Sequence, residues 1–148
     1  MERINFHDSH IESSIHNDDN LTIHFDWAGI QDYATVGHVT DIVVGKCSLV
    51  LSGVTSTVFL KHDNPIYTKR EPGPPQPHVP VDIKEGFILI SLNTFDSTES
   101  GQILTLGGVY DGIEGVYWLE QIIHFRTGRF NWNNHVTVEE WQAGAVTQ

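Results

Sequence analysis

Cysteine is almost missing from this chain of 148 residues: it has only Cys47, which excludes an intramolecular disulfide. A chain of this length fits one domain and buries roughly two-thirds of its unfolded surface, so it folds without a cross-link. The neighbours of Cys47 are apolar and strand-like, which predicts a small buried core residue rather than a reactive nucleophile. We therefore expect a single domain over residues 1–148.

Long hydrophobic runs are missing as well. No apolar run reaches the ~18 residues that a transmembrane helix needs. The first residues, M-E-R-I-N-F-H-D-S, have neither the basic start nor the apolar stretch of a signal peptide. Together with the low cysteine content, these features predict a cytoplasmic protein with no membrane partner.

Basic residues are scarce: eight Lys and Arg stand against nineteen Asp and Glu, a net charge of −11. The charge is −7 over residues 1–45, +2 over 46–84 and −6 over 85–148. This field repels nucleic acid and would attract a basic protein, although acidity also serves solubility alone. Protonation of the nine histidines would bring −11 to −2, so a charge-driven partnership should weaken as the pH falls.

Alternation of apolar and polar residues dominates the chain and predicts strands. One hairpin is expected over residues 10–27, with a turn at 17–20 and Ile11, Ser13 and Ile15 alternating with polar residues. A second pair of strands flanks Ser52-Gly53 within residues 41–60.

The later segments continue this pattern. A strand buried on both faces is expected from Phe87, followed by a loop over residues 94–101. Asp111-Gly112 predicts a hairpin into a strand over 115–125, and residues 126–129 predict a further hairpin. The fold class is therefore mainly β: an antiparallel β-sandwich or partly open barrel of eight or more strands.

Two segments depart from the strand pattern. Residues 62–80 contain all six prolines, which predicts a semi-rigid loop within the domain that is neither central strand nor helix. Thr137 to Glu140 matches a capping box and Gly144 is a suitable stop. We expect a short C-terminal helix here, docked onto the sheet by Trp141.

Motifs for chemistry are weak. His7, Asp8, His10 and Glu12 are the tightest cluster of metal-ligand types, but the ~6.6 Å between same-face residues on a strand strains a single coordination shell. The glycine-rich residues 107–115 lack the lysine of a phosphate loop. The sequence thus supports no catalytic residue, metal or cofactor.

The opening segment carries a resemblance. F-H-D-S-x-I at residues 6–11, followed by D-N-L-T-I-H-F at residues 19–25, resembles the start of small β-rich bacterial proteins that include immunity proteins of toxin–immunity pairs. The resemblance covers about the first sixth of the chain. It implies a cytosolic protein that neutralises a partner by blocking it, without a catalytic residue.

The leading hypothesis is a non-catalytic immunity-type protein that blocks the active site of a basic, nuclease-like toxin domain. Acidic turn residues would stand in for nucleic-acid phosphates, and aromatic side chains would anchor the partner. The candidate partner-binding residues are Asp18, Asp19, Asp96, Glu99, Asp111, Glu114, Tyr110 and Trp132.

Two alternatives stay open. One is a small-molecule-binding β-barrel or barrel enzyme, which needs a cavity lined by Trp27, Phe87 and Trp118. The other is a structural or assembly module with exposed edge strands, which would form a homo-oligomer.

Overall fold

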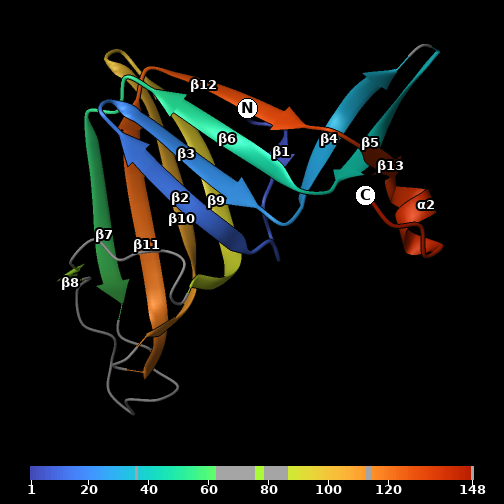
Figure 1. Cartoon of the computed structure of the whole chain (residues 1–148). Coiled ribbons are helices and arrows are strands. Elements are labelled where there is room, and N and C mark those ends of the chain that lie inside the picture. Colours follow the sequence, from blue (N-terminus) through green and yellow to red (C-terminus); the bar gives the residue numbers. More distant parts are fainter. Residues whose placement is uncertain (36, 63–75, 79–86, 113–114, 148) are drawn as a thin grey trace.

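The computed structural model describes residues 1–35, 37–62, 76–78, 87–112 and 115–147. Of residues 35, 76–78, 87–89, 111, 112 and 115 it describes the backbone alone. All strand pairs in this part of the chain are antiparallel, and they form three sheets (Figure 1). The prediction of a mainly β fold with a short C-terminal helix is confirmed.

We name the sheets by their places in Figure 1. The front sheet has the spatial order β12 (Thr127–Trp132), β6 (Cys47–Ser52), β3 (Asn20–Phe25) and β2 (Ile11–Asn17). The back sheet has the order β8 (Gln76–His78), β7 (Ser56–His62), β11 (Gly115–Phe125), β10 (Gly101–Gly112) and β9 (Phe87–Thr98). The arm sheet has the order β1 (Ile4–Asn5), β4 (Ala28–Thr35), β5 (His38–Val44) and β13 (His135–Thr137).

The front and back sheets pack face to face as a sandwich. Their inner faces are built by alternate residues, as a strand with one buried face requires. The front sheet contributes Leu21, Ile23 and Leu49, and the back sheet contributes Leu104 and Ile123, to one continuous core. Each of these side chains is at most 3% exposed.

The arm sheet is a continuation of the front sheet. The strand pairs β3/β4, β5/β6 and β12/β13 are each separated by two residues, at 26–27, 45–46 and 133–134. The register passes straight through these gaps, because Phe25 pairs with Cys47 before the gap and Ala28 pairs with Val44 after it. Aspartate, glycine and asparagine, which are poor strand formers, occupy the gaps. The front and arm sheets are thus one continuous antiparallel sheet. It bends at the three gaps, which lie at the same level along its strands.

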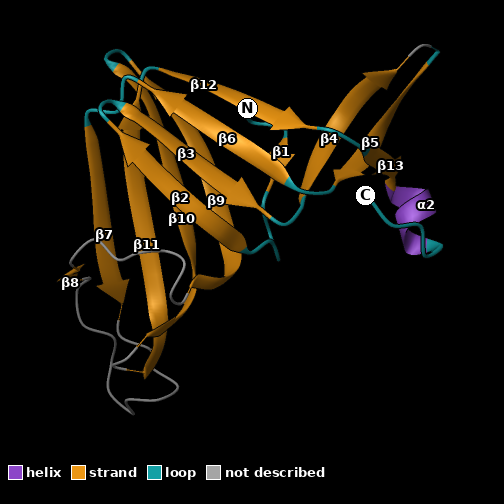
Figure 2. Ribbon diagram, in the orientation of Figure 1, coloured by secondary structure: helices purple, strands orange, loops and turns teal. Residues whose placement is uncertain are grey.

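Helix α2 (Val138–Gln142) lies at the end of the arm sheet (Figure 2). The predicted capping box is confirmed: Glu140 N donates to Thr137 Oγ1 at 3.1 Å, and Thr137 N donates to Glu140 Oε2 at 2.8 Å. Gly144 adopts a φ of +97°, as expected where the helix stops. The described residues contain no helix with the length and hydropathy that crossing a membrane requires.

Two predicted strand pairs are wrong. The strands on either side of Ser52-Gly53 do not pair with each other, since β6 belongs to the front sheet and β7 to the back sheet. The turn at residues 126–129 likewise carries the chain from β11 to β12 in the opposite sheet. These crossings lie side by side, because Arg126 N donates to Ser52 O at 3.0 Å. A tight turn joins sequential strands, but it does not fix whether they share a sheet.

Residues 94–98 form strand rather than the predicted loop. They extend β9 and pair with residues 101–105 of β10, which places the turn at Glu99-Ser100. Leu92 is 41% exposed, so β9 is not buried on both faces as its apolar run suggested. Pairing with a long neighbour overrides the weak strand preference of Asp96 and Ser97.

The Asp111-Gly112 hairpin and the strand over 115–125 are confirmed, with Gly112 paired to Gly115. Most of the predicted proline-rich loop, at 63–75 and 79–80, lies outside the described residues. Its described part, β8, contains Pro77 and is an edge strand of the back sheet, where a missing amide proton is tolerated.

A β-bulge reverses the predicted facing of Ile15. The register of β2 against β3 shifts between Ile11 and Ser13, so that Glu12 has no partner. Ile11 stays in the core, whereas Ile15 beyond the bulge points outward and is 56% exposed. One extra residue moves every later side chain to the other face of the sheet.

This facing predicts different costs for one substitution at two positions. Ile15→Ala should lower the free energy of unfolding by less than about 1 kcal/mol, because the side chain is exposed. Ile23→Ala should lower it by about 2–5 kcal/mol, because it leaves a cavity in the core. Urea denaturation of both variants measures the difference. Equal losses would contradict the bulge.

Candidate functional site

The predicted site residues are dispersed. Asp18 and Asp19 form the β2–β3 turn, Asp96 lies on β9 and Glu99 lies in the β9–β10 turn. The two turns adjoin the chain crossings at one end of the sandwich. Val54 N donates to Asp19 O at 2.8 Å, and Gln102 Nε2 donates to Arg126 O at 3.3 Å.

The remaining candidates lie elsewhere. Glu114 and the side chain of Asp111 lie outside the described residues. Trp132 is half-buried at the end of β12, where the front sheet bends. The candidates among the described side chains therefore do not form one patch.

Tyr110 is a core residue, contrary to its predicted place beside a partner. Its side chain is 6% exposed, and its ring centroid lies 5.2 Å from that of Tyr117. The glycines before it in β10 and the Asp-Gly after it suggested a surface turn. Instead β10 continues through Gly112, and Tyr110 faces the sandwich interior.

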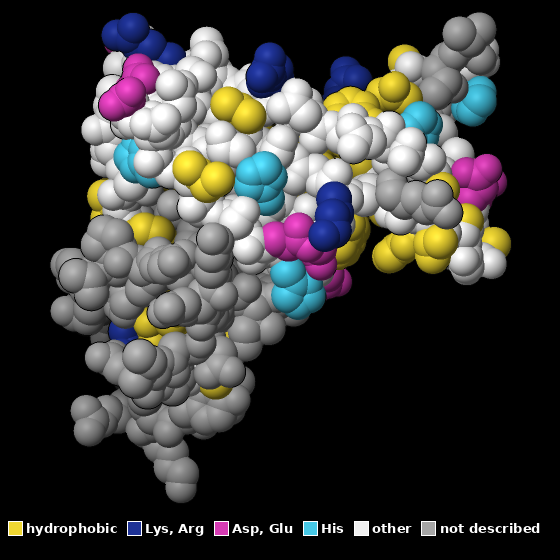
Figure 3. All heavy atoms as spheres, in the orientation of Figure 1, with side chains coloured by type: hydrophobic (Ala, Val, Ile, Leu, Met, Phe, Trp, Pro, Cys, Tyr) yellow, Lys and Arg dark blue, Asp and Glu magenta, His cyan; other side chains and the backbone are white. Residues whose placement is uncertain are grey.

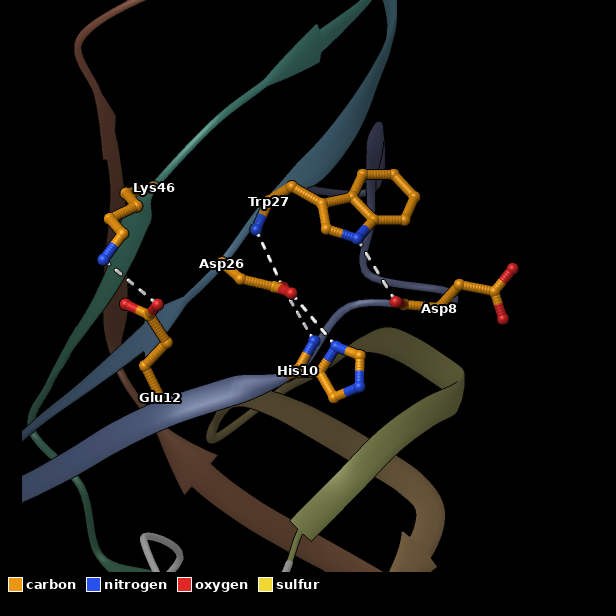
Figure 4. A network of polar contacts seen from close by, with 6 residues as sticks. All are labelled: Asp8, His10, Glu12, Asp26, Trp27 and Lys46. Carbon is orange, nitrogen blue, oxygen red and sulfur yellow. Dashed lines mark hydrogen bonds and ion pairs between the residues drawn. The ribbon is translucent and has the colours of Figure 1, made fainter. Parts of the chain in front are cut away.

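The structure assembles a different cluster at the bend, which we call the bend cluster: Asp8, His10, Glu12, Asp26, Trp27 and Lys46 (Figure 4). Its members come from the segment before β2, from β2 itself and from the gaps that separate β3 from β4 and β5 from β6. In Figure 3, charged and histidine side chains gather where the front sheet gives way to the arm sheet. The surface is hollowed between these side chains and the helix end of the arm.

Asp26 organises the bend cluster. One carboxylate oxygen accepts hydrogen bonds from His10 N at 2.7 Å and from Trp27 N at 2.9 Å. The other lies 3.0 Å from His10 Nδ1. The side chain thereby satisfies backbone amides that the interrupted ladder leaves free, the usual role of aspartate at a break in regular structure. It is still 32% exposed, so its charge reaches solvent.

Trp27 bridges the sandwich and the helix. Its indole Nε1 donates to Asp8 O at 3.2 Å, which fixes the ring. The ring centroid lies 5.5 Å from that of Trp141 on α2, with the planes tilted by 30°. Trp141 is 44% exposed, so part of this aromatic pair faces the solvent. The prediction that Trp141 docks the helix is confirmed.

The segment that carries the sequence resemblance builds one side of the bend cluster. Phe6 is fully buried and stacks on Phe25 at 4.0 Å between ring centroids. Asp8 has a φ of +66°, a conformation that aspartate tolerates better than most residues. This turn directs the Asp8 carbonyl to Trp27 and the next residues toward Asp26. The motif therefore has a clear structural role at the bend.

Carboxylates are in excess at the bend cluster. Asp8, Glu12 and Asp26 supply three carboxylates and Lys46 supplies one ammonium group, whose Nζ lies 3.2 Å from Glu12 Oε1. This pair is exposed and adds little stability. His7 Nδ1 lies 3.2 Å from Asp8 Oδ2. The described residues bring no three His, Cys, Asp or Glu side chains into an arrangement that could hold a metal ion.

The same carboxylates affect Cys47, which is buried as predicted. Burial, with the charges of Asp26 and Glu12 nearby, raises the pKa of the Cys47 thiol to about 12. A neutral thiol is a poor nucleophile, so covalent catalysis by Cys47 near neutral pH is not supported.

The cavity required by the small-molecule hypothesis is not built from the expected residues. Trp27 lies at the bend, whereas Trp118 lies on the outer face of the back sheet over Gly107, and the Phe87 side chain lies outside the described residues. A cleft of about 420 Å³ is instead lined in part by Phe95, Phe130 and Trp132.

In comparison with known proteins, the chain matches no protein family, no curated protein and no solved structure.

Sequence reasoning missed Asp26, Trp27 and their link to Trp141. The predicted first hairpin ran to Trp27, which was expected as a cavity-lining residue, but β3 ends at Phe25. The available signal was the recurrence of strand-breaking residues, at Asp26, Gly45 and Asn133, each between two alternating segments.

The bonding of Asp26 predicts a measurable loss of stability. Asp26→Ala should lower the free energy of unfolding by about 1–3 kcal/mol, because backbone amides of His10 and Trp27 lose their acceptor. Asp26→Asn, which keeps one acceptor oxygen, should lose less. Urea denaturation measures both, with the exposed Glu99→Ala as control. An Asp26→Ala variant as stable as that control would contradict this role.

The raised pKa of Cys47 predicts slow thiol chemistry. In the folded protein at pH 8, Ellman's reagent should label Cys47 roughly a thousandfold more slowly than an ordinary thiol, since the thiolate fraction is that much lower. The rate should keep rising above pH 9, because the thiol is still almost fully protonated there. The urea-unfolded protein is the control and should react at an ordinary rate. Rapid labelling of the folded protein would contradict the raised pKa.

Proposed function

We propose that this protein is a non-catalytic binding protein that neutralises a basic protein partner by covering its active site. The protein would act in the cytoplasm as an immunity protein against a nuclease-like toxin domain. The observation that carries the proposal is the bend cluster, where the hydrogen-bonded carboxylate of Asp26 lies beside Trp27, which contacts the partly exposed Trp141. The resemblance of residues 6–11 and 19–25 to small β-rich bacterial proteins that include immunity proteins supports the same role.

Electrostatics favours a basic partner. The net charge of −11 attracts a cationic domain over distance and raises its association rate. At the bend, Asp8, Glu12 and Asp26 offer carboxylates that can take the positions of phosphate groups in a nuclease cleft. Because Asp26 is already held by three hydrogen-bonding contacts, little side-chain entropy is lost when a partner binds it.

Aromatic surface would supply the anchoring energy. Tryptophan dominates the energetically important positions of protein interfaces, where it buries a large area at low entropic cost. Trp27 and Trp141 lie in contact at the bend, with 5.5 Å between their ring centroids. A partner side chain that packs on this pair would contact indole surface and lie near the Asp26 carboxylate.

The proposal predicts a charge-dependent complex. Purified cationic nuclease domains of bacterial toxins should include at least one that binds saturably, and whose nuclease activity is inhibited in proportion to binding. The affinity should fall as the salt concentration rises, because exposed charges are screened. Calorimetric titration at low and high salt measures this. A panel without any salt-sensitive binder would count decisively against the proposal.

Two double variants with equal charge change locate the binding surface. Asp8→Asn with Glu12→Gln should raise the Kd more than about tenfold, because it removes carboxylates that face the partner. Asp18→Asn with Asp19→Asn removes the same charge from the β2–β3 turn and should raise the Kd less than about threefold. The reverse ranking would assign binding to the turn acids expected from the sequence.

A further inference from the structure

The back sheet has an incompletely covered edge at β9. This strand pairs with β10 alone among the described strands. At twelve residues it is longer than most edge strands, which are usually kept short because their free backbone groups pair readily with other chains. The chain itself covers only part of this edge.

The N-terminal segment covers the first half of the β9 edge. Asp8 N donates to Ile90 O at 2.8 Å, and Ile90 N donates to Ser9 O at 3.0 Å. The Asn93 side chain then accepts from Phe6 N and donates to Ile4 O, both at 3.0 Å. Beyond Asn93, the described residues provide no backbone partner other than β10 for residues 94–98.

An apolar cleft runs beside this uncovered stretch. Its volume is about 420 Å³, and Phe95 and Ser97 of β9 are part of its lining. Phe130 and Trp132 of the front sheet and Ile30 of the arm sheet face them. Phe95, Phe130 and Trp132 are only partly buried against the core. The sandwich is therefore open along this side, with a free sheet edge at the rim of an aromatic cleft.

The combination of edge and cleft identifies the shape of the occupant. A strand added to β9 would pair its backbone with residues 94–98, and alternate side chains would point into the cleft. Neither a helix nor a small molecule would satisfy a row of backbone groups in this way.

The charge at the rim identifies the flanking residues of the occupant. Asp96 and Glu99 are exposed on the uncovered stretch and its turn, and Glu2 lines the cleft. Arg3 also lines it and keeps its charge, since its guanidinium donates to a neutral backbone oxygen, Asp32 O, at 3.2 Å; three carboxylates therefore stand against one guanidinium. The excess of carboxylates favours lysine or arginine in the incoming segment.

We propose that residues 94–98 form a second binding site, which adds an extended segment of a partner protein to the back sheet. One large apolar side chain of the segment occupies the cleft, and its basic residues lie beside Asp96 and Glu99. This site shares no residue with the bend cluster, and it does not require the partner there to be a toxin domain.

Amide hydrogen exchange on the intact protein tests the premise. In the free protein, the amides of residues 94–98 that do not bond to β10 should exchange as fast as those of a loop. Their protection in the free protein would overturn the proposal. If light scattering then showed a dimer at the same concentration, a second copy of the chain would be the occupant instead.

Capped peptides of defined sequence test the occupant. The probe KTVFVTK places phenylalanine on one face of a strand and lysine on the other. At saturation it should slow exchange of the free 94–98 amides at least tenfold. KTVSVTK, which lacks the aromatic side chain, should bind at least tenfold more weakly, and ETVFVTE at least fivefold more weakly. Exchange unchanged by all three peptides, or equal affinities for them, would overturn the proposal.

Protein variants separate this site from the bend cluster. Asp96→Lys with Glu99→Lys should reverse the preference between KTVFVTK and ETVFVTE. Trp141→Ala, which alters the bend, should leave both affinities within twofold of the parent protein. An unreversed preference, or an equal loss of binding in the Trp141 variant, would show that the peptides bind elsewhere.

Discussion

The Asp26 carboxylate is the contact on which the shape of the molecule depends. A β-sheet cannot bend sharply without leaving backbone amides unpaired, and unpaired amides are costly. Asp26 accepts two of them, from His10 and Trp27, in a single side chain. The bend then points the arm sheet and α2 away from the sandwich and brings Trp141 against Trp27. The carboxylate that satisfies these backbone amides thus also places a charge beside the tryptophan pair at the surface.

Sequence alone predicted the class of the fold and its local signals well. Alternation identified the strands, and the Thr137–Glu140 capping box located the helix, because both patterns depend on residues close in the chain. The errors concern residues that are distant in sequence. Neither the crossing at Gly53 nor that at Arg126 differs locally from a hairpin turn. Which sheet each strand joins depends on its partner: β6 pairs with β12, and β7 pairs with β11.

The functional surface was harder to predict for the same reason. Asp18 and Glu99 were recognisable as turn acids, but the bend cluster joins residues from three separate segments, at 8–12, 26–27 and 46, and no motif spans them. Tyr110 was misplaced because exposure depends on how far a strand extends past its glycines. The bulge at Glu12 shows the limit of alternation itself, since one unpaired residue reverses the facing of Ile15.

The order of the strands has a consequence for how the protein is made. β12 and β13, at residues 127–137, leave the ribosome after the other described strands, yet they complete the front and arm sheets by pairing with β6 and β5. Until then, β6 and β5 each have one unpaired edge, and both sheets lack their last strand. Until β12 and β13 emerge, the unpaired edges of β6 and β5 are therefore open to pairing with other chains.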